Sequence, residues 1–312
     1  DAEFQQVFDR RQVFGRKRLT IGVLPLEHGP SGLHTIEGID WITLRLQDLQ
    51  ISGLDAVAVD LRADLPVEWE RCIADFALAG VPVYHSKHLL ESLTGRVELE
   101  HLSETSFGTL SPPQAYMAPK HLVDRIVAAV ALILLLPLFV VVAVLIRSDS
   151  PGPAIFRQQR IGFRGKPFTV YKFRTMRMKT SADQDGRTDA ITRDNDDRIT
   201  RLGKFLRQSR IDELPQIINV LKGQMSWIGP RPEAAVLSAW YESEIPFYRY
   251  RHVVRPGITG WAQIMQGHVT DVDDVRSKLY FDFYYIENFS LWIDGLIVVR
   301  TLVTMVTGFG AK

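Results

Sequence analysis

The sequence contains one cysteine, Cys72, in 312 residues, so no intrachain disulfide is available. A chain without disulfides suits a reducing compartment, and we expect its soluble parts to lie in the cytoplasm. The sequence also lacks H-E-x-x-H spacing, a G-x-S-x-G elbow and a Walker loop. These absences argue against zinc proteases, α/β-hydrolases and P-loop nucleotide hydrolases.

No signal peptide opens the sequence, because residues 1–18 are polar and charged. The chain starts at Asp1 rather than at Met, which leaves open that it is a piece of a longer protein with upstream membrane segments. Long apolar runs are scarce as well. The sequence has one, at residues 126–146, and Pro137 lies near its middle.

This apolar run predicts a membrane helix of 21 residues. A straight helix of that length just crosses a bilayer core of about 30 Å, since it rises about 1.5 Å per residue. Pro137 removes one backbone donor and bends the helix. Two topologies follow: a bent, re-entrant helix with both ends in the cytoplasm, or a straight span that places the N-terminal part outside.

Charge is distributed unevenly along the chain. Residues 1–119 carry 10 Lys and Arg against 17 Asp and Glu, whereas residues 147–210 carry 16 against 7. A basic block directly after the apolar run suits anionic headgroups and phosphorylated ligands. A solvated positive surface on the cytoplasmic side is the simpler alternative.

The first hundred residues alternate between strands and helices, which predicts a small parallel α/β domain. We expect strands at 18–24, 39–44, 55–61 and 81–84, and helices opened by Pro66 and capped by Ser86. The first strand is not followed by G-x-G-x-x-G, so we favour a docking or regulatory role over cofactor binding. Residues 102–119 are the expected linker.

The second half predicts a strand pair over residues 154–176, a mobile polar loop at 179–197 and a helix at 199–208. A further helix starts at Leu214, with apolar residues at i, i+3, i+4 and i+7, Pro215 in its first turn and Gly223 at its end. Residues 290–309 are apolar but contain two charges. They predict an interfacial helix, with a buried core helix as the alternative.

Asp212 and Glu213 are the leading candidates for chemistry. They stand at the predicted start of the Leu214 helix, where free N–H groups and the helix dipole stabilise an ionised carboxylate and attract phosphate. One acid could attack a substrate while the other holds a metal. The structural alternative is an N-cap aspartate followed by a first-turn glutamate.

Three other clusters accompany this acid pair. In G-P-R-P, two prolines fix the backbone around Arg231, whose guanidinium suits bidentate phosphate recognition. The R-P-G-I-T-G-W loop from Arg255 is a substrate wall or a turn anchored by its tryptophan. A third cluster consists of basic residues that are interleaved with aromatic residues, as on nucleic-acid-binding surfaces. The adjacent membrane run favours lipid phosphate or a nucleotide diphosphate as the ligand instead. The basic residues are Arg157, Arg160, Arg164, Lys166, Lys172 and Arg174.

Taken in order, these segments resemble the bacterial sugar transferases, the monotopic phosphoglycosyl transferases that act on polyprenyl phosphate. The resemblance covers roughly residues 117–312. It is carried, besides the proline-broken apolar helix, by KHLVDR from Lys120, GPAIFRQQRIGFRGKPFTVYKFRTM from Gly152, DRITRLGKFLRQSRIDELPQIINVLKGQMSWIGPRP from Asp197, RPGITGWAQ from Arg255 and YFDFYYIENFSLWIDGLIVVRT from Tyr280.

The resemblance implies a two-part fold. Residues 1–116 would form an α/β, Rossmann-like accessory domain of the CoA-binding type. Residues 117–312 would form a mainly helical, membrane-embedded catalytic domain, with a Pro-broken re-entrant helix at about 121–147. The expected location is the bacterial inner membrane, with the catalytic domain on its cytoplasmic face. The longer members of the family favour a homodimer, and no nucleic acid is expected as a partner.

The resemblance also implies a reaction: transfer of sugar-1-phosphate, with a hexose as the expected sugar, from a UDP-sugar to undecaprenyl phosphate, with release of UMP. Asp212 would be the nucleophile, and Glu213 would hold Mg²⁺. Phosphate contacts would come from Arg231 first, and also from Arg160, Lys172, Arg174 and Arg210. The step would open the synthesis of an exopolysaccharide, capsule or O-antigen, with glucose or galactose as the expected hexose.

The chain departs from the family pattern at two places. Many members have Lys-Arg where this chain has Lys120-His121, and small members often have Ser-Pro where it has Leu136-Pro137. A serine hydroxyl can donate a hydrogen bond to a carbonyl freed at the bend, whereas leucine has no donor. Two other functions stay open: a membrane-tethered scaffold that binds nucleotide sugar without turnover, and a ternary-complex transferase in which Asp212 is only a metal ligand.

Overall fold

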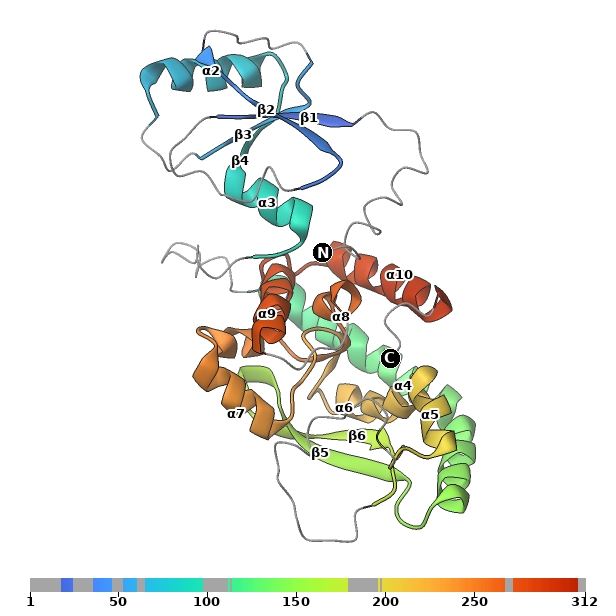
Figure 1. Cartoon of the computed structure of the whole chain (residues 1–312). Coiled ribbons are helices and arrows are strands. Elements are labelled where there is room, and N and C mark those ends of the chain that lie inside the picture. The colour runs from blue at the N-terminus through green and yellow to red at the C-terminus, as the bar shows by residue number, and fades with distance from the viewer. Residues whose placement is uncertain are drawn as a thin grey trace. The chain divides into compact units, whose positions relative to one another are not determined.

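The computed structural model describes residues 18–24, 36–46, 53–60, 65–97, 112, 114–178, 196, 198–266 and 272–307. The chain divides into two compact units, Asp1–Arg96 and Val97–Lys312 (Figure 1). They are called the N-terminal and C-terminal units below. The division falls before the boundary predicted at residues 116 and 117, and the CoA-binding-type and catalytic assignments of the two parts stay predictions.

The N-terminal unit is built on a four-stranded sheet in which all strands are parallel, in the order β2-β1-β3-β4. Two helices, α2 and α3, complete it. The predicted parallel α/β organisation is therefore confirmed, whereas its Rossmann-like character stays a prediction. The elements are β1 (Leu19–Val23), β2 (Ile39–Thr43), β3 (Ala56–Val59), α2 (Val67–Leu78), β4 (Val83–His85) and α3 (Ser86–Thr94).

Strand β3 explains why this unit needs a helix on each face of the sheet. All four of its residues are buried. Val57 and Val59 pack with Phe76 of α2, whereas Ala56 and Ala58 pack with Leu89 of α3. Because successive side chains of a strand point to opposite faces, α2 and α3 cover opposite sides of the sheet.

The capping prediction for α3 needs a correction. Ser86 is the first helical residue and is buried, while His85 occupies the N-cap position. The His85 side chain accepts a hydrogen bond through Nδ1 from the Lys87 backbone N–H at 3.2 Å. An imidazole nitrogen thus does the work that was expected of a serine hydroxyl.

The C-terminal unit opens with a single long helix, α4 (Gln114–Asp149), which has 36 residues and contains Pro119 and Pro137. The predicted linker at 102–119 is therefore wrong from Gln114 onward, because the helix already starts there. Within the described residues α4 is the one helix long and apolar enough to cross a membrane. Its ribbon changes direction along its course in Figure 1, and whether it re-enters the cytoplasmic side stays a prediction.

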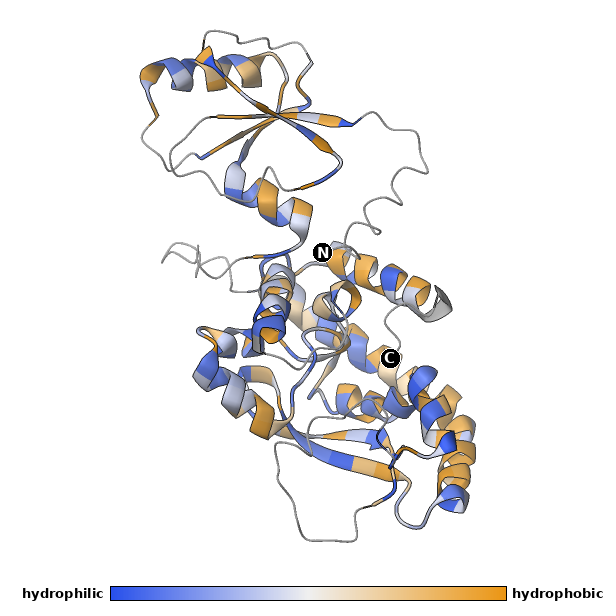
Figure 2. Cartoon of the chain, in the orientation of Figure 1, coloured by the Kyte–Doolittle hydropathy of each residue, from blue (hydrophilic) through white to orange (hydrophobic). Residues whose placement is uncertain are grey.

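One face of α4 packs on the rest of the C-terminal unit along most of its length. The contacting residues recur at helical spacing and meet strand β6 and helices α5 and α6. The opposite face is exposed and apolar, and Figure 2 shows hydrophobic residues along α4 and also along α10. The packed residues are Ala128, Ala131, Leu132, Leu135, Phe139, Val142 and Ile146.

Two small sheets and short helices hold the centre of this unit. Strands β5 (Ile155–Ile161) and β6 (Pro167–Phe173) are antiparallel, as the sequence predicts, and β7 (Ser226–Ile228) pairs in parallel with β8 (Gly257–Thr259). The remaining elements are η6 (Phe163–Gly165), α5 (Arg201–Gln208), η7 (Ile211–Gln216), α6 (Ile217–Leu221), α7 (Ala235–Glu244), η8 (Tyr248–Val253), α8 (Trp261–Met265), α9 (Val272–Glu287) and α10 (Leu291–Thr307).

Helix α10 combines an exposed apolar face with a buried charge. Leu291 and Trp292 are 74% and 82% exposed, as expected for an interfacial helix. Asp294, in contrast, is buried, and its Oδ2 lies 2.5 Å from Lys120 Nζ of α4. This ion pair fixes α10 against the amino end of α4. The predicted polar loop at 179–197 lies outside the described residues, apart from Asp196.

Candidate active site

Asp212 and Glu213 lie on η7, a 3-10 helix that leads into α6. The α-helix predicted from Leu214 is thus corrected: it begins at Ile217. Pro215 has no N–H to donate, so regular α-helical bonding is delayed beyond it. Arg210 precedes η7 with a positive φ of 58°. Both acids are nearly enclosed, with exposed fractions of 8% and 7%.

Glu213 is the meeting point of three segments. Its Oε1 lies 2.8 Å from Lys172 Nζ of β6 and 2.8 Å from Arg231 Nη2, and its Oε2 lies 3.9 Å from Arg210 Nη1. Burial on its own would raise the pKa of Glu213, but Arg231 and Lys172 outweigh it and hold that pKa well below its usual range. Glu213 is therefore an ionised residue held by two cations.

Asp212 differs sharply from its neighbour. No hydrogen bond or ion pair reaches its carboxylate from the described part of the chain. Burial, followed by the charge of Glu213, raises the pKa of Asp212, and Lys172, Arg207 and Arg231 oppose the rise. A helix start was expected to keep this group ionised, but burial acts the other way. A carboxylate without partners is free to react with a ligand.

Arg231 is positioned by close packing of two backbone turns. A Cβ at Gly229 would lie 2.3 Å from the Arg255 carbonyl oxygen, and one at Gly257 would lie 2.1 Å from the Gly229 nitrogen. Only glycine allows this approach. The G-P-R-P turn and the R-P-G-I-T-G loop are thus one structure, in which β7 and β8 pair. The two sequence clusters were predicted separately.

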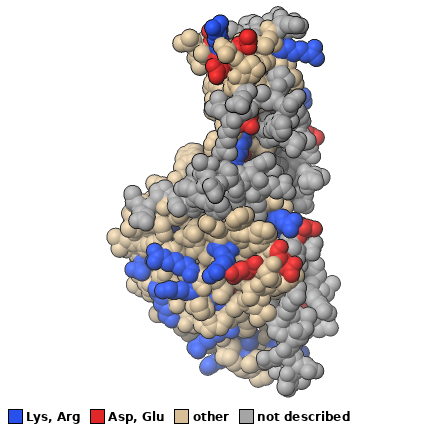
Figure 3. Space-filling model, turned by 90° about the vertical axis from the view of Figure 1, so that its left-hand side faces the viewer, with Lys and Arg blue, Asp and Glu red and all other residues tan. Residues whose placement is uncertain are grey.

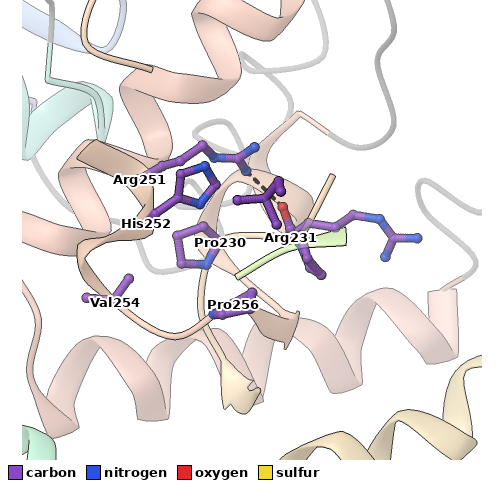
Figure 4. A pocket seen from close by; sticks show the side chains of 8 residues that line it. Pro230, Arg231, Arg251, His252, Val254 and Pro256 are labelled. Carbon is purple, nitrogen blue, oxygen red and sulfur yellow. Dashed lines mark hydrogen bonds between the residues drawn. The ribbon is translucent and has the colours of Figure 1, made fainter. Parts of the chain in front are cut away.

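A buried network of hydrogen bonds and ion pairs fixes the backbone of Arg231. Arg251 donates through Nη2 to the Arg231 carbonyl oxygen at 2.9 Å and to Asp282 Oδ2 at 2.8 Å. Its Nη1 donates to the Tyr248 hydroxyl at 2.7 Å. Figure 4 shows the Arg251 side chain reaching the Arg231 backbone, while the Arg231 guanidinium points away from it. Sequence reasoning missed this network, since its members lie far apart in the chain.

A small cavity adjoins this network. It has a volume of about 10 Å³, roughly one water molecule, and Pro230, Arg251 and His252 are among its lining residues (Figure 4). Arg251 Nε and His252 Nε2 have no hydrogen-bond partner among the described residues. Burial, reinforced by Arg251, lowers the pKa of His252 to about 3, so its imidazole is neutral.

Arg160 and Arg174, which were predicted to contact phosphate, instead donate hydrogen bonds to other groups of the protein. Arg160 donates to the Pro232 carbonyl oxygen and, at 2.9 Å, to Gln158; burial, followed by Arg231, lowers its pKa to about 10. Arg174 is buried and donates to the carbonyl oxygens of Pro151 and Ser150 at 2.8 and 2.6 Å. It thus caps the carboxyl end of α4, where a cation is favoured.

The remaining basic residues are distributed over an exposed face. The Arg157 guanidinium and the Lys222 ammonium lie 5.9 and 4.7 Å from the ring centroid of Tyr171. On the face drawn in Figure 3, Lys and Arg side chains are more extensive than Asp and Glu on the C-terminal unit. Trp261, the tryptophan of the R-P-G-I-T-G-W loop, is buried and stacks on Tyr284, which supports the anchoring alternative.

The adjacent carboxylates fit a magnesium ion. Magnesium prefers hard oxygen ligands and usually binds one or two carboxylates together with substrate phosphates. Within the described residues Asp212 has no partner and Glu213 Oε2 has only Arg210, at 3.9 Å, so one oxygen of Glu213 is available alongside the first acid. Lys172 and Arg231 already balance the two negative charges. An anionic ligand would therefore be expected to bring the ion with it.

Comparison with known proteins shows the family of the chain. Residues 115–308 match the family described as bacterial sugar transferase, so the chain belongs to that family. It is 50% identical over 287 residues to the UDP-N-acetylgalactosamine-undecaprenyl-phosphate N-acetylgalactosaminephosphotransferase of Aeromonas hydrophila, which covers 92% of this chain and 66% of that relative. It is 46% identical over 190 residues to the UDP-glucose:undecaprenyl-phosphate glucose-1-phosphate transferase of Xanthomonas campestris pv. campestris, over 60% of this chain and 39% of the relative.

These relatives are longer than the chain, which spans about two thirds of the first and two fifths of the second. The Aeromonas relative matches most of both units. The Xanthomonas relative and the transferase of the same name from Caulobacter vibrioides, 43% identical over 190 residues, cover 60% of the chain. The family match lies within the C-terminal unit, where the acid pair also lies.

Proposed function

We propose that the protein transfers sugar-1-phosphate from a UDP-sugar to undecaprenyl phosphate and releases UMP. The observation that carries this proposal is the contrast between two adjacent buried acids. Glu213 is neutralised by Lys172 and Arg231, whereas no described residue forms a hydrogen bond or ion pair with the Asp212 carboxylate. One acid is thus built into the site, and the other is left to attack. The names of the relatives supply the substrate classes.

In the first step, an Asp212 carboxylate oxygen attacks the phosphorus that carries the sugar. The bond from that phosphorus to the oxygen bridging it to UMP breaks, UMP leaves with the electron pair, and a phosphosugar-aspartate forms. The guanidinium of Arg231 and the ammonium of Lys172 both contact Glu213, which is the residue next to the nucleophile in the sequence. Cations at this place stabilise the charge that gathers on the phosphoryl oxygens.

In the second step, a phosphate oxygen of undecaprenyl phosphate attacks the same phosphorus. The bond to Asp212 breaks, and its carboxylate is regenerated. The product is undecaprenyl-diphospho-sugar, which retains the sugar phosphate. Two displacements at one carboxylate require that its oxygens are not already hydrogen-bonded, and among the described residues none hydrogen-bonds to the Asp212 carboxylate.

A magnesium ion belongs to the same proposal, with Glu213 as the residue that would hold it. When bound, it would neutralise charge on the diphosphate and on the leaving UMP. Glu213→Gln should weaken the dependence of the rate on magnesium concentration. An unchanged dependence would count against this assignment.

The packing of α4 supports a re-entrant helix at the cytoplasmic face of the inner membrane. Residues near both ends of the apolar run, Ala128 and Ile146, pack on the same C-terminal unit. A helix crossing straight to the far side would carry one of these ends away from that unit or draw the unit into the lipid. Labelling of a cysteine placed before residue 120 tests this. Protection from outside reagents is expected for re-entry.

For the sugar, we propose N-acetylgalactosamine ahead of glucose or galactose. The Aeromonas relative, whose name contains this sugar, matches 92% of the chain, whereas the glucose transferases match 60%. UMP release should be measured with undecaprenyl phosphate and a panel of UDP-sugars. The largest kcat/KM is expected with UDP-N-acetylgalactosamine. Donor binding without UMP release from any donor would instead indicate a scaffold that binds nucleotide sugar.

A further inference from the structure

Two arginines, Arg125 and Arg255, form no ion pair within the part of the chain that the structure describes. Arg125 is exposed on α4, and within the described residues it makes no hydrogen bond or ion pair. Its guanidinium lies against Gly223, where an added Cβ would be 2.4 Å from Arg125 Nη2. Gly223 has a φ of 73°, so glycine provides both the turn and the room for this side chain.

Arg255 comes from the turn that precedes β8. Its Nε and Nη1 are enclosed and have no hydrogen-bond partner among the described residues. An enclosed donor without a partner destabilises the fold. Burial, followed by the charge of Arg125, lowers the pKa of Arg255, while Asp124 opposes the shift. The two guanidiniums therefore repel each other.

One acid nearby, Asp124, attracts Arg255, and its Oδ2 also accepts a hydrogen bond from the Ser226 hydroxyl at 2.7 Å. One carboxylate does not balance the charge of two guanidiniums. Asp294 lies 2.5 Å from Lys120 and so neutralises that cation instead. A pair of unneutralised guanidiniums is stabilised by an external anion, and phosphate oxygens suit their planar donors.

The position on α4 identifies the source of the phosphate. Arg125 directly precedes the apolar run, and its neighbours Leu122, Val123 and Ile126 are 60%, 57% and 55% exposed. Apolar side chains beside an exposed arginine are typical of the level where lipid headgroups lie. We propose that Arg125 and Arg255 bind the phosphate group of an anionic phospholipid.

The proposed lipid site uses other side chains than the proposed reaction. Arg125 and Arg255 have no part in the attack by Asp212, and lipid retention is measured without turnover. The lipid site depends on α4 lying at the membrane, and it stands even where the transfer reaction is not the one proposed.

Lipid retention by the full chain in detergent tests the site. The protein is mixed with equal amounts of phosphatidylglycerol and phosphatidylcholine, and bound lipids are counted by native mass spectrometry. Phosphatidylglycerol should be retained several-fold over phosphatidylcholine, and Arg125→Gln together with Arg255→Gln should bring the two to parity. The single variant Arg125→Lys keeps the charge, so it should retain part of the preference for phosphatidylglycerol. Arg249→Gln is the matched control, since Arg249 is exposed and paired with Glu242 at 3.0 Å.

Two results would overturn the site. One is a preference for phosphatidylglycerol that is equal in the native protein and in the folded double variant, checked by circular dichroism. The single variant Arg125→Gln removes an exposed side chain and serves where the double variant does not fold. The other is arginine-dependent retention of undecaprenyl phosphate with none of phosphatidylglycerol, which would identify a site for the acceptor.

Discussion

The two units use buried charge very differently. Among the described residues, the buried polar side chains of the N-terminal unit are Ser86 and Glu91. Those of the C-terminal unit include two ion pairs, Arg251 with Asp282 and Lys120 with Asp294, besides the acid pair. Burying a charge is costly unless it is paired. The unit that matches the transferase family carries this cost, which indicates that its charges are kept for function and positioning.

The core of the N-terminal unit is mainly apolar. Val57, Val59 and Phe76 form its core on one face of the sheet, and its acids stay at the surface or near lysine and histidine. A parallel sheet covered by two helices needs no buried ion pair to be stable. The contrast suggests that substitutions of buried acids should affect the two units to very different extents.

The largest effect is expected from Asp212→Asn. The side chain stays almost the same size, but an amide does not attack phosphorus, so UMP release should fall by about 10⁴-fold. Asp40→Asn is the control from the N-terminal unit, since Asp40 is exposed. Appreciable UMP release by the pure variant would exclude Asp212 as the nucleophile.

Asp282→Asn should reduce stability strongly. It leaves the buried Arg251 without its charge partner, at a cost of about 3–5 kcal/mol in the free energy of unfolding. Glu91→Gln in the N-terminal unit should cost less, about 1 kcal/mol, because Lys87 Nζ lies 3.7 Å from Glu91 Oε1, beyond hydrogen-bond distance. Chemical denaturation of each variant measures the difference. Equal losses would remove the distinction between the units.

The pH dependence of the rate should reflect Lys172. Burial lowers the pKa of Lys172 to about 8, while Glu213 opposes the shift. Below pH 8 the ammonium is charged and neutralises Glu213, and above it that charge is lost. We therefore expect kcat/KM to decline above about pH 8, and Lys172→Arg, which stays charged, to move the decline to higher pH. A flat profile from pH 7 to 9 in the native protein would contradict this.

The smallest effect on turnover is expected from Arg174→Gln. Its donors cap the carboxyl end of α4, so the variant should lose about 1–3 kcal/mol of stability with the donor KM changed by no more than about twofold. Arg231→Gln should raise the donor KM or lower kcat by about tenfold or more. If the donor KM rises equally in both variants, the capping assignment of Arg174 is incomplete.

Local patterns in the sequence predict much of this fold but few of its ion pairs. Alternation predicted the parallel sheet, and the basic strand pair and the helix at Thr200 also follow from local residues. The 3-10 turn at Asp212 was missed, although Pro215 was noted, because the delay in helical bonding depends on packing around it.

Long-range partners could not be predicted. Arg251 reaches Asp282 across 31 residues, and Lys172 reaches Glu213 across 41, with no periodicity that links them. The fate of Arg174 shows the same limit. Its charge suggested a phosphate contact, whereas its burial beneath the end of α4 depends on how β6 packs against that helix.

The most direct test of the central claim is to trap the intermediate. The protein is incubated with a UDP-sugar labelled in the sugar phosphate, without undecaprenyl phosphate, and then analysed by peptide mass spectrometry. The account predicts one labelled phosphosugar per chain on the peptide that contains Asp212, and its loss when the acceptor is added. Rapid turnover with both substrates and no labelled peptide at any time would contradict it, and would indicate direct attack by the lipid phosphate.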